Sequence, residues 1–277
     1  MQLYDHIQEA VAHIRTLTDF QPQTGIILGT GLGSLTDDML IACEIDYKDI
    51  PHFPLSTVES HKGKLVFGYL EGKAVVTMAG RFHYYEGYSM QQVTFPVRVM
   101  KFLGIDTIYI TNVAGSTNSD IEAGDLVFVR DHINLQPENP LRGSNDERLG
   151  VRFPDMLATY DKALIANALN ISKKNNIQAH TGVYVALQGP NLETPAEYNF
   201  INTIGGDLVG MSTVPEVLVA RHSGLRIMVI SLVSNKCFPI EDIKETTLES
   251  VIAIAHQAEL KMRLVIRKLL NDGENVD

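Results

Sequence analysis

Residues 25–34 read Gly-Ile-Ile-Leu-Gly-Thr-Gly-Leu-Gly-Ser, which joins a short apolar run to a glycine-rich loop. The run 25–28 lies between the turn signals Pro22 and Gly29, and this pattern predicts a buried strand. Glycines after such a strand let the backbone turn tightly and bring its N–H groups near an anion, to which Thr30 adds a hydroxyl. The loop by itself is equally compatible with an ordinary strand-to-loop turn.

Short apolar runs alternate with helical patterns along the rest of the chain. Further strands are expected at 64–70, 73–79, 108–111, 126–129, 182–187, 226–233 and in a run ending at Gly210, and the first two form a hairpin around Glu71-Gly72. Helical spacing of apolar residues occurs at 2–17, 89–103, 160–175, 214–223 and 247–269. Strands interleaved with helices predict an α/β fold with a mixed, largely parallel central sheet flanked by helices. Because no repeat or linker divides the chain, residues 1–277 are expected to form a single domain.

Composition excludes several classes of protein. The net charge is −10, with 33 acidic against 23 basic residues, so a nucleic-acid partner is not expected. No apolar run is long enough to span a membrane, and charged residues interrupt the first helical pattern, so we expect no signal peptide and a cytoplasmic location. Cys43 and Cys237 lie in apolar surroundings and are expected to be reduced and buried. The nine histidines are scattered, which predicts no metal site.

A loop rich in aromatic residues follows the strand 73–79. Residues 80–88 read Gly-Arg-Phe-His-Tyr-Tyr-Glu-Gly-Tyr, so Arg81, His83 and Tyr85 alternate and point to the same side of an extended segment. Arg81 and His83 can grip a phosphate or carboxylate, since arginine offers a bidentate fork, and Tyr85 can pack on a sugar. A surface loop whose aromatic rings cover the core is the alternative interpretation.

Two further motifs suit a nucleobase. The stretch 188–197 contains Glu193 near a predicted helix start, and one carboxylate can accept hydrogen bonds from two neighbouring N–H groups of a base. The motif Ser-Asn-Lys at 234–236 places Asn235 after a strand, where its amide offers both a donor and an acceptor to a purine. The alternatives are that Glu193 only stabilises the N-terminus of the helix and that Asn235 is only a turn residue.

Small and hydroxyl residues follow two other strands. The stretch 111–116 allows backbone amides to approach a ligand, and Ser212 with Thr213 begins a helix, where an anion is readily bound. A turn and ordinary N-capping explain these residues equally well. Each of the six motifs follows a predicted strand, and ligands of open α/β sheets bind at the carboxyl ends of strands. We therefore expect the motifs to meet in one crevice.

Taken together, the motifs resemble the trimeric, 6-oxopurine-type purine nucleoside phosphorylases (nucleoside phosphorylase family 2), in the family's order from the glycine loop to Asn235. The distinctive segments are Gly-Arg-Phe-His-x-Tyr-Glu-Gly-Tyr, Asp-His-Ile-Asn-Leu, Asn-Asp-Glu-Arg, Gly-Pro-x-x-Glu-Thr-x-Ala-Glu, Gly-Met-Ser-Thr-Val-Pro-Glu and Ser-Asn-Lys. The resemblance implies the nucleoside phosphorylase fold and a pentosyltransferase activity. Inosine- or guanosine-type (deoxy)ribonucleosides and phosphate would give free purine and (deoxy)ribose 1-phosphate. Phosphate is then a co-substrate, no cofactor is needed, and the assembly is a homotrimer.

The resemblance also implies roles for individual residues. The phosphate ligands would be Thr30, His61, Arg81, His83, the backbone N–H of Val113, and Ser212. The ribose would contact Tyr85, Met211 and, from the neighbouring subunit, Phe153. The base would contact Val113, Leu192, Glu193, Val209 and Asn235. Catalysis would rest on Asn235, Glu193 and His83.

The chain departs from the family pattern at two places. Leu192 stands where a phenylalanine is common, and residues 237–255 contain no histidine, although many relatives bind the ribose 5′-hydroxyl with one there. Thr247 or Leu248 is expected near that place. An apolar 5′ pocket is a feature of the related methylthioadenosine phosphorylases, but these carry an acidic residue where this chain has Asn235.

Three other functions compete with phosphorolysis of inosine- or guanosine-type nucleosides. Methylthioadenosine phosphorolysis is the nearest. A nucleoside hydrolase would leave Arg81, His83 and Ser212 without a purpose. A non-catalytic dinucleotide-binding module would use the glycine loop, but its GxGxG spacing and the absence of an acidic residue about 20 positions later count against that function.

Overall fold

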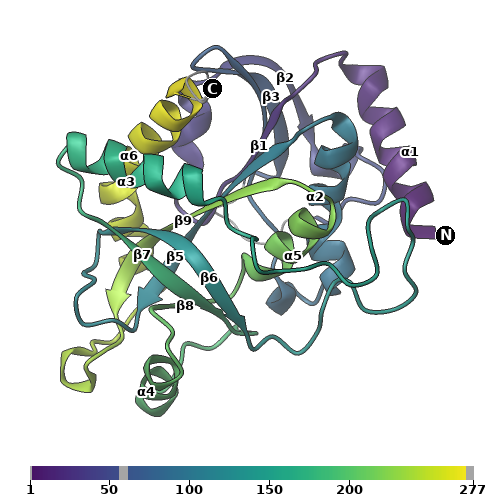
Figure 1. Ribbon diagram of the computed structural model, residues 1–277. Helices are drawn as coiled ribbons and strands as arrows, with labels where there is room; N and C mark the ends of the chain where they lie inside the picture. The colour runs from purple at the N-terminus through teal and green to yellow at the C-terminus, as the bar shows by residue number, and fades with distance from the viewer. Residues whose placement is uncertain (1, 56–61, 273–277) are drawn as a thin grey trace.

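Apolar strands build the centre of the molecule, as the sequence predicts. The computed structural model describes residues 2–55 and 62–272, whose strands form a nine-stranded mixed sheet (Figure 1). The strands are β1 Thr24–Ile27, β2 Leu40–Asp46, β3 Lys64–Leu70, β4 Lys73–Ala79, β5 Thr107–Ser116, β6 Leu126–Asn134, β7 Ala179–Ala186, β8 Leu208–Gly210 and β9 Arg226–Lys236. Their order is β2-β3-β4-β1-β5-β8-β7-β6-β9, and β5 also pairs with β9. Strands β5, β8, β7, β6 and β9 therefore close into a ring.

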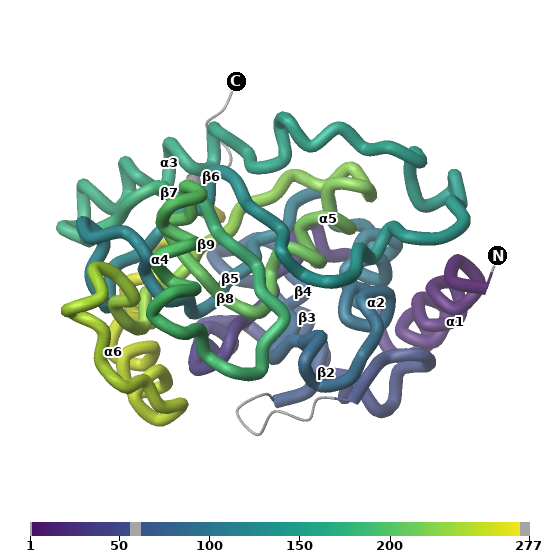
Figure 2. Tube along the Cα trace, turned by 90° about the horizontal axis from the view of Figure 1, so that it is seen from below, coloured from purple at the N-terminus to yellow at the C-terminus, as the bar shows by residue number. Residues whose placement is uncertain are grey.

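Helices cover the sheet in two groups. They are α1 Gln2–Leu17, α2 Met90–Leu103, α3 Lys162–Lys174, α4 Pro195–Thr203, α5 Val214–His222 and α6 Leu248–Asp272, with short 3₁₀ turns at Gly33–Asp38, Tyr47–Asp49, Tyr84–Glu86 and Ile240–Asp242. Helices α1, α2 and α5 pack together at one side, while α3 packs on α6 at the other (Figures 1 and 2). Within the described part of the chain, no helix combines the length and apolar character needed to cross a bilayer.

The predicted α/β class and mixed sheet are confirmed. Both pairings of β1, with β4 and β5, are parallel, whereas β3 and β4 form the predicted antiparallel hairpin with the expected bounds. Cys237 is buried and free as expected, but the prediction for Cys43 was wrong in part, because this free thiol is half-buried. Leu248, at the start of the predicted helical pattern 247–269, is exposed, and the first buried residue of α6 is Ala255.

Strand β2 escaped prediction because it lies at the edge of the sheet. It pairs with β3 alone, and its residues Leu40 and Ile41 are exposed. Burial on one face produces the alternation that marks a strand in sequence, and an exposed edge has no such requirement. Pairing with β3, and not an alternation of apolar residues in its own sequence, therefore makes β2 a strand.

Strands β5 and β9 run farther than predicted, and this extension positions the polar motifs. The segments 111–116 and 234–236 lie inside these strands instead of following them, so the alternative interpretation of both as turns is wrong. The ladder between β5 and β9 shifts after Ala114, which pairs with Val233, to Gly115, which pairs with Asn235. Ser234 is the extra residue of this bulge. A bulge bends its strand and redirects the next side chain, here that of Asn235.

Candidate active site

One cavity collects the predicted motifs at the carboxyl ends of β1, β4, β5, β7, β8 and β9. Its empty volume, counted with the open mouth, is about 730 Å³. Its lining includes the predicted residues Thr30, Arg81, His83, Tyr85, Val113, Leu192, Glu193, Val209, Met211, Ser212 and Asn235. Segments from six strand ends thus converge as expected for this kind of sheet.

Arg81 forms one end of the cavity and is held by two partners. Its Nη1 donates to Ser212 Oγ at 3.1 Å, and its Nε lies 3.1 Å from Glu216 Oε1. Arg81 and Glu216 are almost wholly buried, so the carboxylate neutralises a guanidinium that would be costly to bury alone. The pair fixes the guanidinium next to the Ser212 hydroxyl at the start of α5, where an anion is also favoured by backbone N–H groups.

His83 is oriented by a carboxylate three residues later. Glu86 Oε1 lies 2.9 Å from His83 Nδ1 and accepts the His83 backbone N–H at 2.8 Å. An Nδ1–H donated to this carboxylate leaves Nε2 as the second functional atom of the ring. The Tyr85 ring stacks on His83 with centroids 4.6 Å apart, so Tyr85 takes its place beside the Arg81 end.

Thr213 adopts a strained backbone conformation that shapes this end. Its φ of 73° and ψ of −57°, with a 2.8 Å bond from Val214 N–H to Ser212 O, define a γ-turn that is rare for β-branched residues. Thr213 makes no side-chain N-cap bond, which removes the ordinary capping interpretation for it. Instead its Oγ1 accepts from Asn112 Nδ2 at 3.0 Å and lies 3.1 Å from Ser212 Oγ. The strain thus holds the Ser212 hydroxyl in the cavity.

Glu193 and Asn235 add a carboxylate and an amide to the lining of the same cavity. Asn235 follows the bulge on β9, and Glu193 lies just before α4, whose N-cap is Thr194. Thr194 and Glu197 complete a capping box, so Glu193 is not needed to cap the helix, and its carboxylate serves the cavity. Val209 and Leu192 add apolar surface, and Leu192 is half-exposed at 48%.

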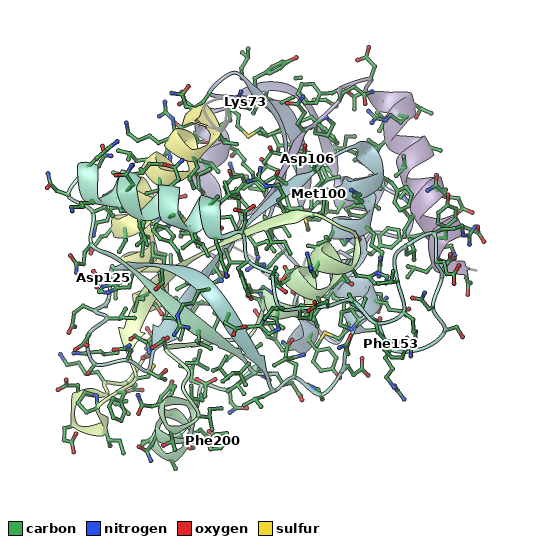
Figure 3. All side chains as sticks on the ribbon, viewed as in Figure 1. Lys73, Met100, Asp106, Asp125, Phe153 and Phe200 are labelled. Atoms are coloured by element: carbon green, nitrogen blue, oxygen red, sulfur yellow. The ribbon has the colours of Figure 1, made fainter. Side chains whose placement is uncertain are left out.

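Two predicted residues and one predicted region lie elsewhere. His61 lies outside the described residues. Phe153 does not line the cavity of its own chain; its side chain is 86% exposed on the long loop after β6 (Figure 3). Near the expected 5′ region, Thr246 and Val251 line the cavity rather than Thr247 or Leu248.

Comparison with known proteins decides the family. The model of the phosphorylase superfamily matches residues 23–271. Purine nucleoside phosphorylase 1 of Bacillus subtilis is 52% identical over 238 residues, covering 86% of this chain and 88% of the relative. The rat purine nucleoside phosphorylase is 44% identical over 273 residues, covering 96% and 94%. The chain belongs to the purine nucleoside phosphorylase family.

Solved structures of the family agree with this assignment. Isoform 2 of the Schistosoma mansoni purine nucleoside phosphorylase, in complex with cytosine and ribose-1-phosphate, superposes with a TM-score of 0.92 at 38% identity and covers 97% of this chain and 96% of its own. A Schistosoma purine nucleoside phosphorylase, in complex with hypoxanthine, gives a TM-score of 0.91 at 40% identity, with 96% of each chain covered. The family fold therefore extends over nearly the whole chain.

Sequence reasoning missed several residues around the cavity of this family member. Asn112, Gly115 and Tyr198 line the cavity. Glu86 contacts His83, and Glu216 forms an ion pair with Arg81. Only Glu86 left a local signal, because it lies three residues after His83 in a capping-box spacing. The others depend on contacts between distant segments.

Proposed function

We propose that this family member cleaves inosine- and guanosine-type (deoxy)ribonucleosides with inorganic phosphate, releasing the purine base and (deoxy)ribose 1-phosphate. The observation that carries the proposal is a single cavity lined both by a buried arginine bonded to a serine hydroxyl and by a carboxylate and an amide. Phosphate is the co-substrate, and the chemistry requires no cofactor. We place the activity in the cytoplasm.

The two ends of the cavity fit the charges that develop in this reaction. As the C1′–N9 bond breaks, its electron pair leaves with the purine, and the sugar becomes positive. A phosphate held by Thr30, Arg81, His83 and Ser212 balances the positive sugar, and one phosphate oxygen then bonds to C1′. The Asn235 amide donates to the purine N7, and the Glu193 carboxylate accepts base N–H groups. Such preorganised contacts stabilise charge that appears only in the transition state.

The relatives support the same substrate class. The Schistosoma proteins were solved with cytosine and ribose-1-phosphate, with adenosine, and with hypoxanthine, so their ligands include a sugar phosphate, a purine nucleoside and a purine base. Of these, hypoxanthine is the 6-oxopurine that inosine would release here. Val113, Tyr85 and Met211 would lie along the sugar and base between the two ends.

We also infer a homotrimer in which Phe153 enters the neighbouring subunit's site. Phe153 is 86% exposed, and Val151 and Leu157 beside it are 64% and 90% exposed, so this loop presents apolar side chains with no cover in their own chain. Large exposed apolar surface marks an interaction site. Light scattering should give three times the mass of the chain, and a monomer with full activity would overturn the trimer.

A nucleoside panel tests the proposed reaction. Inosine, guanosine, adenosine and methylthioadenosine are incubated with the protein, with and without phosphate, and the free bases are separated by chromatography. We expect base release from inosine and guanosine only with phosphate. Equal release without phosphate indicates a hydrolase, and preference for methylthioadenosine indicates the related phosphorylase. NAD binding without base release indicates a dinucleotide-binding module.

The pH profile should reflect Glu193. Burial raises the pKa of Glu193 and the Glu197 charge raises it further, while its own backbone N–H and the Tyr198 hydroxyl lower it. Only the charged carboxylate accepts base N–H groups, so activity is present above this pKa and is lost as the pH falls through it. The acidic limb of kcat/KM for inosine should therefore lie above the value of about 4.3 for an ordinary glutamate. A limb that stays in place in Glu193→Gln would assign it to another group.

A further inference from the structure

We propose that Glu259 and Arg263, on the C-terminal helix α6, are positioning residues that hold the glycine-rich loop after β1 in the shape that presents Thr30 to phosphate. This role rests on the proposed function and deepens it, because it assigns the placement of one phosphate ligand to a helix that follows 225 positions later in the chain. Neither Glu259 nor Arg263 belongs to any of the six motifs.

The first end of the loop is fixed by the central sheet. The Gly29 N–H donates to Thr111 Oγ1 at 3.1 Å, and the Thr111 hydroxyl donates to Ile27 O at 3.0 Å. A Cβ on Gly29 would lie 2.9 Å from Cα of Asn112, so the backbone of the loop lies directly against β5 here. The residue just before Thr30 therefore has a firm support of its own.

The other end of the loop is fixed by α6. The Ser34 N–H donates to Glu259 Oε1 at 2.8 Å, and Arg263 Nη1 donates to Ser34 Oγ at 2.8 Å. Glu259 is 5% exposed and the Arg263 side chain 19%, so both bonds lie largely out of water. Arg263 also donates to both oxygens of Asp38, from Nε at 2.9 Å and from Nη2 at 2.5 Å. A bidentate pair of this kind fixes the guanidinium in one orientation.

The loop packs against the same helix between its two ends. Gly31 has a φ of 72°, which side-chain-bearing residues rarely adopt, and a Cβ there would lie 3.0 Å from Cβ of Ala255. Ala255 is fully buried and lies one turn before Glu259. Thr30 thus lies between a residue held by the sheet and a residue packed on α6.

This support matters because the loop has little rigidity of its own. Glycines occupy every second position from 29 to 33, and such a segment has many backbone conformations to lose when it binds a ligand. Contacts with α6 order the loop during folding, so less freedom is lost when phosphate binds. Val251, near the start of α6, lines the cavity, so one helix reaches both the cavity wall and the loop.

Arg263→Met tests the role by removing the guanidinium while keeping most of the apolar length of the side chain. We expect the KM for phosphate to rise about 10-fold, which corresponds to the loss of one hydrogen bond to a charged group. The KM for inosine and kcat at saturating phosphate should stay within about twofold, because the contacts to the base are unchanged. The matched control is Arg267→Met, one turn later on α6, where the arginine bonds Glu71 in the turn between β3 and β4. That variant should keep both KM values.

A pair of variants at Glu259 separates the hydrogen bond from packing. Glu259→Gln keeps an acceptor for the Ser34 N–H and should leave the KM for phosphate within about twofold. Glu259→Leu removes the acceptor and should raise this KM about as much as Arg263→Met. Hydrogen exchange without phosphate gives a readout that needs no activity: the Ser34 amide should exchange faster in Glu259→Leu and at the wild-type rate in Arg267→Met. Thermal unfolding shows whether each variant is folded, and the partly exposed Arg263 keeps the test open if Glu259→Leu does not fold.

A double-mutant cycle with Thr30→Val shows whether the effect passes through Thr30. Valine keeps the shape of the side chain and removes the hydroxyl. In the Thr30→Val background, Arg263→Met should raise the KM for phosphate by less than about twofold, because the contact that it positions is already gone. A full 10-fold rise in that background would show that Arg263 does not act by placing Thr30.

Two further results separate this role from the proposed function. If the wild-type protein releases hypoxanthine from inosine only with phosphate, and Arg263→Met matches Arg267→Met in its KM for phosphate, the role of α6 is overturned. If the wild-type protein releases no base, the proposed function fails, and calorimetry with inorganic phosphate then decides the role of α6. Weaker binding in Arg263→Met alone supports it, and equal binding in all three proteins, or binding in none, excludes it.

Discussion

Asn235→Ala is expected to lower turnover on inosine by at least about 100-fold, because it removes the donor that meets negative charge on the departing purine. Removal of a single preorganised donor of this kind costs about 3–4 kcal/mol of transition-state stabilisation in a typical enzyme. The bulge at Ser234 holds this donor in place before the substrate arrives, so little reorganisation is required during the reaction. Glu193→Ala should have a similar effect through the loss of the base N–H acceptor. Steady-state kinetics with saturating phosphate measures both.

The control for Asn235→Ala is Asn199→Ala on the exposed face of α4. That variant should keep the wild-type rate. Thermal unfolding of Asn235→Ala should show a cooperative transition, which excludes loss of the fold as the cause. Near-normal turnover in either Asn235→Ala or Glu193→Ala would remove that residue from the base-binding pair.

The second large effect is expected at the other end of the cavity, in the double variant Arg81→Gln/Glu216→Gln. Arg81 and Glu216 form a buried ion pair, so removing one partner strands a charge in the interior and costs about 3–5 kcal/mol of stability. The double replacement removes both charges and should stay folded. It also takes away the guanidinium fork that binds a phosphate, so the KM for phosphate should rise about 100-fold or more.

Hypoxanthine binding separates this effect from general damage. Calorimetry on the double variant should give a hypoxanthine affinity within about twofold of the wild type, because we expect hypoxanthine to contact Glu193 and Asn235 and not Arg81. The single variant Arg81→Gln should unfold at a lower temperature than the double variant. An unchanged KM for phosphate in the folded double variant would place the phosphate elsewhere.

Much of the local structure follows from the sequence. The hairpin of β3 and β4 and the helix α1 have the predicted bounds, since alternation, turn residues and apolar spacing act over a few neighbouring positions. The residues of the candidate site could also be predicted as a set, because each motif places unusual side chains at the end of a predicted strand. Among the predicted site residues that the structure describes, all except Phe153 line one cavity, and His61 lies outside the described residues.

The long strands β5 and β9 exceeded their predicted length for a physical reason. Their second halves contain Asn112, Gly115 and Asn235, which have low intrinsic preference for strands. Pairing between two buried strands overrides that preference, and the bulge at Ser234 accommodates it. The intrinsic strand preference of one segment carries no information about the partner strand that supplies its hydrogen bonds.

The sequence alone predicted the α/β class, most of the helices and strands, and the set of side chains that line the cavity. Only the tertiary structure decided how those groups are held. Arg81 meets Ser212 across 131 positions, Glu216 neutralises the guanidinium, and Tyr198 and Cys237 come from different elements into one apolar cluster. The reason is that such contacts are set by packing between distant segments, whose partners leave no local periodicity in the chain.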